Sequence, residues 1–161
     1  MPRNKIIYLD HAAATPVAPA VIKTMVSYWR TAHGNPSSLH SFGRDAKDVL
    51  ESSRATIATY LDCGPREIVF TSGGTESINL ALKGYLSGQK KQRQHIISTT
   101  IEHAAAAETL RSLKAAGHAV TLIPCAPNGI IEADRVIRAI TPETALISVI
   151  FAQNEIGTLQ P

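Results

Sequence analysis

The sequence predicts an α/β fold built on a mostly parallel sheet with helices on both faces. Short apolar runs alternate along the chain with stretches of helical period, which is typical of parallel strands joined by helices. The segment TALISVIF, Thr144 to Phe151, is almost wholly apolar, as expected of a strand covered on both faces. With 44% hydrophobic and 18% charged residues, the 161-residue chain suits one compact domain with a buried core.

The N-terminal part predicts an arm followed by two helices. Residues 1–15 form the arm, which ends before Pro16. From Pro16 to His33 the apolar residues fall on one helical face, and Gly34-Asn35-Pro36 ends this helix. Ser37 or Ser38 can cap the second helix. The residues expected on its inward face are Leu39, Phe42, Ala46, Val49, Leu50, Ser53, Ile57 and Leu61.

The rest of the chain predicts alternating strands and helices. The expected strands are Ile68–Phe70, His95–Thr100, Ala119–Ile123 and Thr144–Phe151. The expected helices are 75–87, 103–116 and 132–140. In the second of these, Leu110 and Leu113 face inward and Gly117 stops the helix.

Charge and cysteine content argue against several classes of protein. The formal net charge is +3 and the pI about 9.0, but the basic residues are scattered. Their one dense cluster, at 90–93, is expected to be a solvated loop, and no RNA-binding signature accompanies it. Cys63 and Cys125 form no CxxC pair, so reduced thiols are expected and no metal site. No membrane-spanning stretch or signal peptide is evident, which predicts a cytoplasmic location.

Parallel sheets bind ligands beyond the carboxyl ends of their strands, so the loops after Phe70, Thr100 and Phe151 are the predicted sites of chemistry. The first loop is TSGGTES, residues 71–77. Its glycines, hydroxyls and helix start can seat a phosphate, or form an ordinary capped turn. It matches neither the ATP-type nor the dinucleotide-type glycine motif.

The other two loops carry a histidine and an amide. His103 opens a helix after a strand, where its ring can stack on a flat cofactor, move a proton, or serve a structural role. Asn154 follows the most apolar strand and can hold a hydroxyl or carboxylate, or bond local backbone. If the strands are parallel, all three loops converge on one crevice suited to a flat phosphorylated cofactor.

Five segments together identify a family. They are YLDHAAATPV (8–17), HGNPSSLHSFGRDA (33–46), PREIVFTSGGTESINLALKG (65–84), IEHAA (101–105) and QNEIGTLQP (153–161). By these segments, in this order and at this spacing, the chain resembles the N-terminal part of cysteine desulfurases. Those proteins are pyridoxal-phosphate enzymes of the class V aminotransferase type, and the resemblance implies the large domain of fold-type I enzymes over residues 16–161.

The resemblance implies a role for each of four residues. Gly74 and Thr75 would seat the phosphate of pyridoxal 5′-phosphate. His103 would stack on the pyridine ring and assist proton transfer as the catalytic residue. Asn154 would hydrogen-bond the pyridoxal 3′ oxygen and the substrate carboxylate. The implied reaction converts L-cysteine to L-alanine and an enzyme persulfide, which supplies iron–sulfur cluster assembly or tRNA thiolation.

Some features depart from the family pattern. The chain ends at Pro161, before the family's Schiff-base lysine, nucleophilic cysteine and substrate-binding arginine, so we expect it to be incomplete as an isolated enzyme. His11 stands where asparagine is usual, and Gly74 where alanine is common. The expected partners are a second copy of the chain or a complementing C-terminal half, and a sulfur-acceptor protein; no nucleic acid or membrane is expected.

Two other functions stay open. The chain could be a non-catalytic truncated remnant or a module that only binds partners. It could also belong to a selenocysteine lyase or another class V enzyme, because the cysteine loop that best separates these is absent from the sequence.

Overall fold

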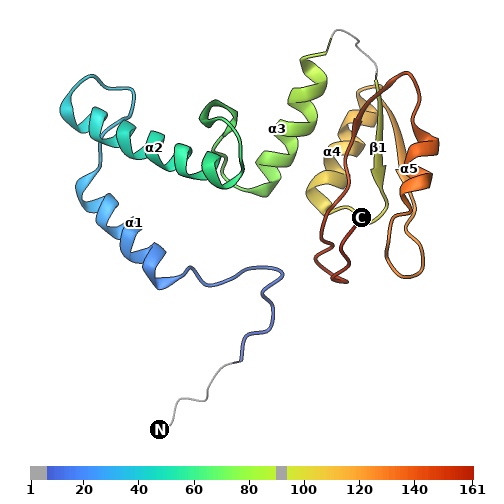
Figure 1. The fold of residues 1–161 in the computed structure, drawn as a ribbon, viewed down its shortest axis with the longest axis horizontal. Helices are drawn as coiled ribbons and strands as arrows, with labels where there is room; N and C mark the ends of the chain where they lie inside the picture. Colours follow the sequence, from blue (N-terminus) through green and yellow to red (C-terminus); the bar gives the residue numbers. More distant parts are fainter. Residues whose placement is uncertain (1–6, 90–93) are drawn as a thin grey trace. The chain divides into compact units, whose positions relative to one another are not determined.

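The computed structural model describes residues 7–89 and 94–161, so the basic cluster at 90–93 lies outside the described residues. The chain divides into two compact units, Met1–Phe70 and Thr71–Pro161, and each is described by itself (Figure 1). Among the described residues no helix is long and apolar enough to cross a membrane.

The second unit contains a three-stranded parallel sheet. Its strands are β1 (His95–Thr99), β2 (Ala119–Ile123) and β3 (Thr144–Ile147), in the order β2-β1-β3. The predicted fold class, a mostly parallel sheet with helices, is therefore confirmed. A helix follows each of the first two strands, as the right-handed crossover of parallel strands requires.

Helices cover both faces of the central strand (Figure 1). Ile96 and Ile97 of β1 are fully buried and point to opposite faces because successive side chains of a strand alternate. On one face Ile96 packs among leucines of α3 (Gly74–Ser87) and α4 (Ala104–Ala115), namely Leu82, Leu86, Leu110 and Leu113. On the other, Ile97 packs with Ile123 and Ile131, beside Val136 and Ala139 of α5 (Ala133–Ala139).

The predicted elements of this unit agree with the structure to within about one residue, apart from the last strand. Leu110 and Leu113 are buried as predicted, and Gly117 ends the helical segment with a φ of 98°, which glycine adopts readily. The strand predicted over Thr144–Phe151 stops at Ile147, and β3 is half-buried or exposed instead of covered on both faces. An apolar run shows strand propensity, but its length as a strand depends on hydrogen-bonding neighbours.

The first unit contains α1 (Pro19–Thr31), α2 (Ser41–Tyr60) and the short 3-10 helix η1 (Pro65–Glu67). The inward face predicted for the second helix is only partly covered: Ala46, Val49 and Leu50 are half-buried, and the other predicted residues are exposed. The buried residues of α2 are Gly43 and Ala58, whereas Leu39 is 91% exposed. Helical period identifies an apolar face, but burial depends on what packs against it, which a single sequence does not reveal.

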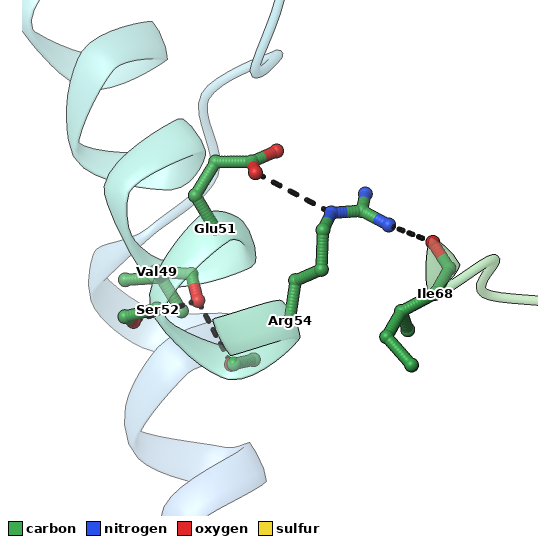
Figure 2. Close-up of polar contacts among 6 residues, drawn as sticks. Val49, Glu51, Ser52, Arg54 and Ile68 are labelled. Atoms are coloured by element: carbon green, nitrogen blue, oxygen red, sulfur yellow. Dashed lines mark hydrogen bonds and ion pairs between the residues drawn. The ribbon is translucent and has the colours of Figure 1, made fainter. Parts of the chain in front are cut away.

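The strand predicted at Ile68–Phe70 is also wrong. Ile68 has extended dihedral angles, but the segment pairs with no strand in the part of the chain that the structure describes. An arginine of α2 holds it instead: Arg54 donates to the Ile68 carbonyl at 2.5 Å, and its guanidinium lies 5.0 Å from the Phe70 ring centroid. Figure 2 shows Arg54 bridging this carbonyl and Glu51, whose carboxylate is 3.3 Å from Nε.

Candidate active site

The loop that begins α3 is held by its own hydroxyl groups. The Thr71 and Ser77 hydroxyls lie 2.6 Å apart, and both lie within hydrogen-bonding distance of the Gly73 carbonyl. Glu76 folds back over the loop, where its carboxylate accepts from the backbone N–H and the hydroxyl of Ser72, each at 2.6 Å. These two hydrogen bonds hold the pKa of Glu76 below its usual value, and the bond from the Ser72 hydroxyl has the larger effect.

The same loop leaves donors free for a ligand. The first backbone bond of α3 runs from Ser77 N to Gly73 O at 3.0 Å, so the N–H groups of Gly74, Thr75 and Glu76 have no backbone acceptor among the described residues. In that part of the chain the Thr75 hydroxyl has no protein partner either. A Cβ added at Gly73 or Gly74 would meet nothing within 4 Å, which leaves space against the backbone.

His103 is the N-cap residue of α4. Its Nδ1 accepts a hydrogen bond from the Ala105 N–H at 3.1 Å, which satisfies one of the free donors of the helix start. Because Nδ1 accepts, the proton of the neutral ring lies on Nε2. The ring is exposed, with its orientation set by the cap, and Nε2 is available for another partner.

Thr75 and His103 line one groove between α3 and α4. The groove has a volume of about 390 Å³. Thr75, Asn79 and Lys83 lie on one face of α3, since residues four apart share a helical face. The remaining lining residues are His103, Ala104, Ala105, Glu108 and Thr109.

Asn154 does not line this groove. It lies at the tip of a tight hairpin in which Gln153 N donates to Thr158 O, and Gly157 N to Gln153 O, each at 2.9 Å. The Asn154 side chain donates to the Glu155 carboxylate at 3.0 Å. The structure thus brings together two of the three predicted groups, Thr75 and His103, while a cofactor role for Asn154 stays a prediction.

Two residues that shape this region are absent from the site predicted by sequence. Gln153 caps the hairpin tip, where its side-chain oxygen accepts from Glu155 N at 2.5 Å and Ile156 N at 2.9 Å. The Glu102 carboxylate accepts from the Thr99 hydroxyl and from Ile150 N, each at 2.8 Å. Their positions beside Asn154 and His103 are the one signal in the sequence that could have identified them.

The donor types fit a phosphorylated aromatic cofactor. Unpaired N–H groups at a helix start with an adjacent hydroxyl suit a phosphate, and an imidazole in the same groove suits a flat ring. Among the described residues no group of three His, Cys, Asp or Glu side chains is arranged to hold a metal ion. Cys63 and Cys125 are free thiols.

Comparison with known proteins identifies relatives of the whole chain. Cysteine desulfurase IscS of Rickettsia massiliae (strain Mtu5) is 42% identical over 156 residues, which cover 96% of this chain and 38% of that protein. A solved NifS-like protein superimposes with a TM-score of 0.89 at 37% identity, over 93% of this chain and 41% of its own. A solved structure of SspA in complex with cysteine superimposes with a TM-score of 0.91 at 38% identity. The match covers 96% of this chain and 44% of that one.

The chain therefore spans about two fifths of the length of these relatives. The family model for class-V aminotransferases matches residues 7–161, almost the whole sequence. Enzymes of this family use pyridoxal phosphate in general. The chain belongs to the class-V aminotransferase family.

Proposed function

We propose that this chain supplies the phosphate- and ring-binding part of a pyridoxal 5′-phosphate site in a protein of the cysteine desulfurase type. The observation that carries the proposal is that Thr75 and His103 line one groove between two helix starts. In this proposal residues 1–15 are an N-terminal arm and residues 16–161 are the N-terminal part of the cofactor-binding large domain.

Gly74 and Thr75 would hold the phosphate. The free N–H groups at the start of α3 offer charge-assisted hydrogen bonds to phosphate oxygens, and the partial positive charge of a helix N-terminus favours the anion. The Thr75 hydroxyl adds one more donor. Because the glycines leave open space, the phosphate can approach the backbone without a steric clash.

His103 would cover the cofactor ring and take part in proton transfer. The hydrogen bond to Ala105 fixes the ring orientation, so little rotamer entropy is lost when a flat ligand stacks on it. The same bond occupies Nδ1 and directs proton exchange to Nε2. Asn154 would hold the 3′ oxygen of the cofactor and the substrate carboxylate.

L-cysteine is the proposed substrate. The support comes from relatives, which are named cysteine desulfurases and include a solved complex with cysteine. Pyridoxal phosphate, when bound, supplies the electron sink for chemistry at the amino-acid α-carbon. The proposed products are L-alanine and a persulfide, with a sulfur-acceptor protein as a partner and a homodimer or a complementing C-terminal half completing the site.

A titration of the chain with pyridoxal 5′-phosphate tests the cofactor site. We expect saturable binding, followed by fluorescence, and competition by inorganic phosphate. Thr75→Val should weaken binding about tenfold through loss of a hydrogen bond to a charged group. Thr56→Val is the matched control, because within the described ranges the Thr56 hydroxyl bonds only the Ser52 carbonyl of its own helix. Absence of saturable binding, or equal effects of the two variants, would contradict the cofactor site.

The activity has a separate test. The chain is mixed with the part of the Rickettsia massiliae relative that it does not match, and alanine release from L-cysteine is measured together with sulfide, which an added thiol reductant frees from the persulfide. Release that depends on His103 is expected. A folded mixture that binds the cofactor but leaves cysteine unchanged would contradict the desulfurase proposal while preserving the cofactor site.

A further inference from the structure

Glu102 lies where strand β1 leaves the sheet. The ladder between β1 and β3 continues past β3 through Ser148 N, which donates to Ile97 O at 2.9 Å. In a parallel ladder the next donor along this side, Ile150 N, would bond the Thr99 carbonyl. The structure instead directs Ile150 N to the Glu102 carboxylate at 2.8 Å.

The carboxylate is itself fixed by strand β1. The same oxygen, Oε1, accepts from the Thr99 hydroxyl at 2.8 Å, and Thr99 is only 3% exposed. One oxygen atom therefore joins the last residue of β1 to the segment that follows β3. Hydrogen bonds to a charged acceptor are stronger than those between neutral groups, so this junction is firmer than the ladder bond that it replaces.

Both ends of this junction lead directly to proposed cofactor residues. Glu102 immediately precedes His103, and Ile150 lies four residues before Asn154. From these contacts we propose that Glu102 is a positioning residue whose carboxylate couples the His103 helix start to the Asn154 hairpin. The effect of this coupling on cofactor binding rests on the proposed roles of His103 and Asn154. The hydrogen bonds of Glu102 to Thr99 and Ile150 do not depend on those roles.

Amide hydrogen exchange of the full chain, resolved by NMR, tests the coupling. Glu102→Ala removes the acceptor, and we expect Ile150 N to exchange at least tenfold faster, with shifted signals from both the Asn154 side-chain amide and the His103 ring. Glu102→Gln keeps an oxygen acceptor and should restore protection to within about threefold of the unsubstituted chain. Because glutamine has nearly the shape of glutamate, Glu102→Met, which fills similar space without an oxygen acceptor, separates the two roles: it should exchange as fast as Glu102→Ala, whereas a merely space-filling role would be rescued by methionine as well.

Glu132→Gln is the matched control. Glu132 is an exposed carboxylate that pairs with Arg135 three residues away, so its substitution should leave Ile150, His103 and Asn154 unchanged. If Glu102→Ala does not fold, Thr99→Val replaces it, because loss of the hydroxyl should free the carboxylate and speed exchange at Ile150. Unchanged exchange at Ile150 in the folded variant would overturn the coupling.

Binding of pyridoxal 5′-phosphate, used as the probe, gives the functional result. Glu102→Ala should weaken binding about tenfold and Glu102→Gln by less than threefold. Equal affinity in a variant with a disturbed hairpin would overturn the positioning role. Failure of the unsubstituted chain to bind the probe would instead count against the proposed cofactor site, and the exchange measurement would still decide whether Glu102 couples the two segments.

Discussion

The side-chain amide of Gln160 binds the backbone at Ile131 from 29 residues away in the sequence. Its oxygen accepts from Ile131 N at 2.7 Å, and its nitrogen donates to the Gly129 carbonyl at 3.0 Å. Gln160 is 5% exposed, so both ends of the amide are used where water has little access. This contact joins the base of the Asn154 hairpin to the turn that precedes α5.

Gln160→Leu should lower the free energy of unfolding by about 2–4 kcal/mol, because it leaves a buried donor and a buried acceptor unpaired. Urea denaturation of the chain measures the change. The control is Gln89→Leu at an exposed position, which should change stability by less than about 0.5 kcal/mol. Similar small effects of the two substitutions would show that Gln160 does not anchor the hairpin.

Gly129→Ala should destabilise the chain more than Gly157→Ala. Both glycines have positive φ, 78° and 73°, so each alanine carries a backbone cost of about 1–2 kcal/mol. At Gly129 the new Cβ would also lie 2.6 Å from Ile156 Cδ1 and 2.9 Å from Thr158 Cγ2, whereas at Gly157 it meets nothing within 4 Å. Thermal denaturation of the two variants gives the difference, and an equal loss would exclude the close contact.

Ser72→Ala should raise the pKa of Glu76 toward the ordinary glutamate value of about 4.3. The substitution removes the hydroxyl hydrogen bond, which is the larger of the two that lower this pKa. Since the folded-state pKa is lowered, the stabilisation from Glu76 is present above the ordinary pKa and is lost as the pH falls through the folded-state value. An NMR titration of the Glu76 carboxyl carbon measures the shift; no change would contradict the hydrogen bond between the Ser72 hydroxyl and Glu76.

Substitutions of His103 should separate capping from cofactor binding. Asparagine is a strong N-cap residue, so His103→Asn should preserve stability, while His103→Ala should cost about 0.5–2 kcal/mol. Both variants lack the ring and should bind pyridoxal 5′-phosphate more weakly by a similar factor. Melting curves and ligand titrations together test this, and full binding by the asparagine variant would exclude stacking on the histidine.

Arg54→Lys should destabilise the first unit by about 1–2 kcal/mol. Lysine retains a charge near Glu51, but it lacks the planar group that meets the Ile68 carbonyl (Figure 2) and also lies over the Phe70 ring. Arg66→Lys, within η1, is the matched control, since the side chain of Arg66 has no partner among the described residues. Urea denaturation compares the two, and equal stability would remove Arg54 as the residue that holds the extended segment.

Local patterns in the sequence were sufficient to predict the parallel sheet and its helices. The spacing of the apolar residues fits a strand at Ile96 and Ile97, a helix at Leu110 and Leu113, and a strand at Ile123. These residues form the core. The polar turn that begins α3 was predictable for the same reason, because the glycines and hydroxyls of TSGGTES act on backbone within a few residues of themselves.

Tertiary structure decided which polar groups meet. The sequence suggests that Thr75, His103 and Asn154 converge, but the groove contains only the first two, because the hairpin tip at Asn154 is set by Gln153 and by contacts 29 residues away. The segment Ile68–Phe70 has strand composition yet pairs with an arginine side chain. Propensity and periodicity reflect residues that are close together in the sequence. Hydrogen-bond partners such as Glu102 and Ile150 instead depend on where the fold brings distant segments together.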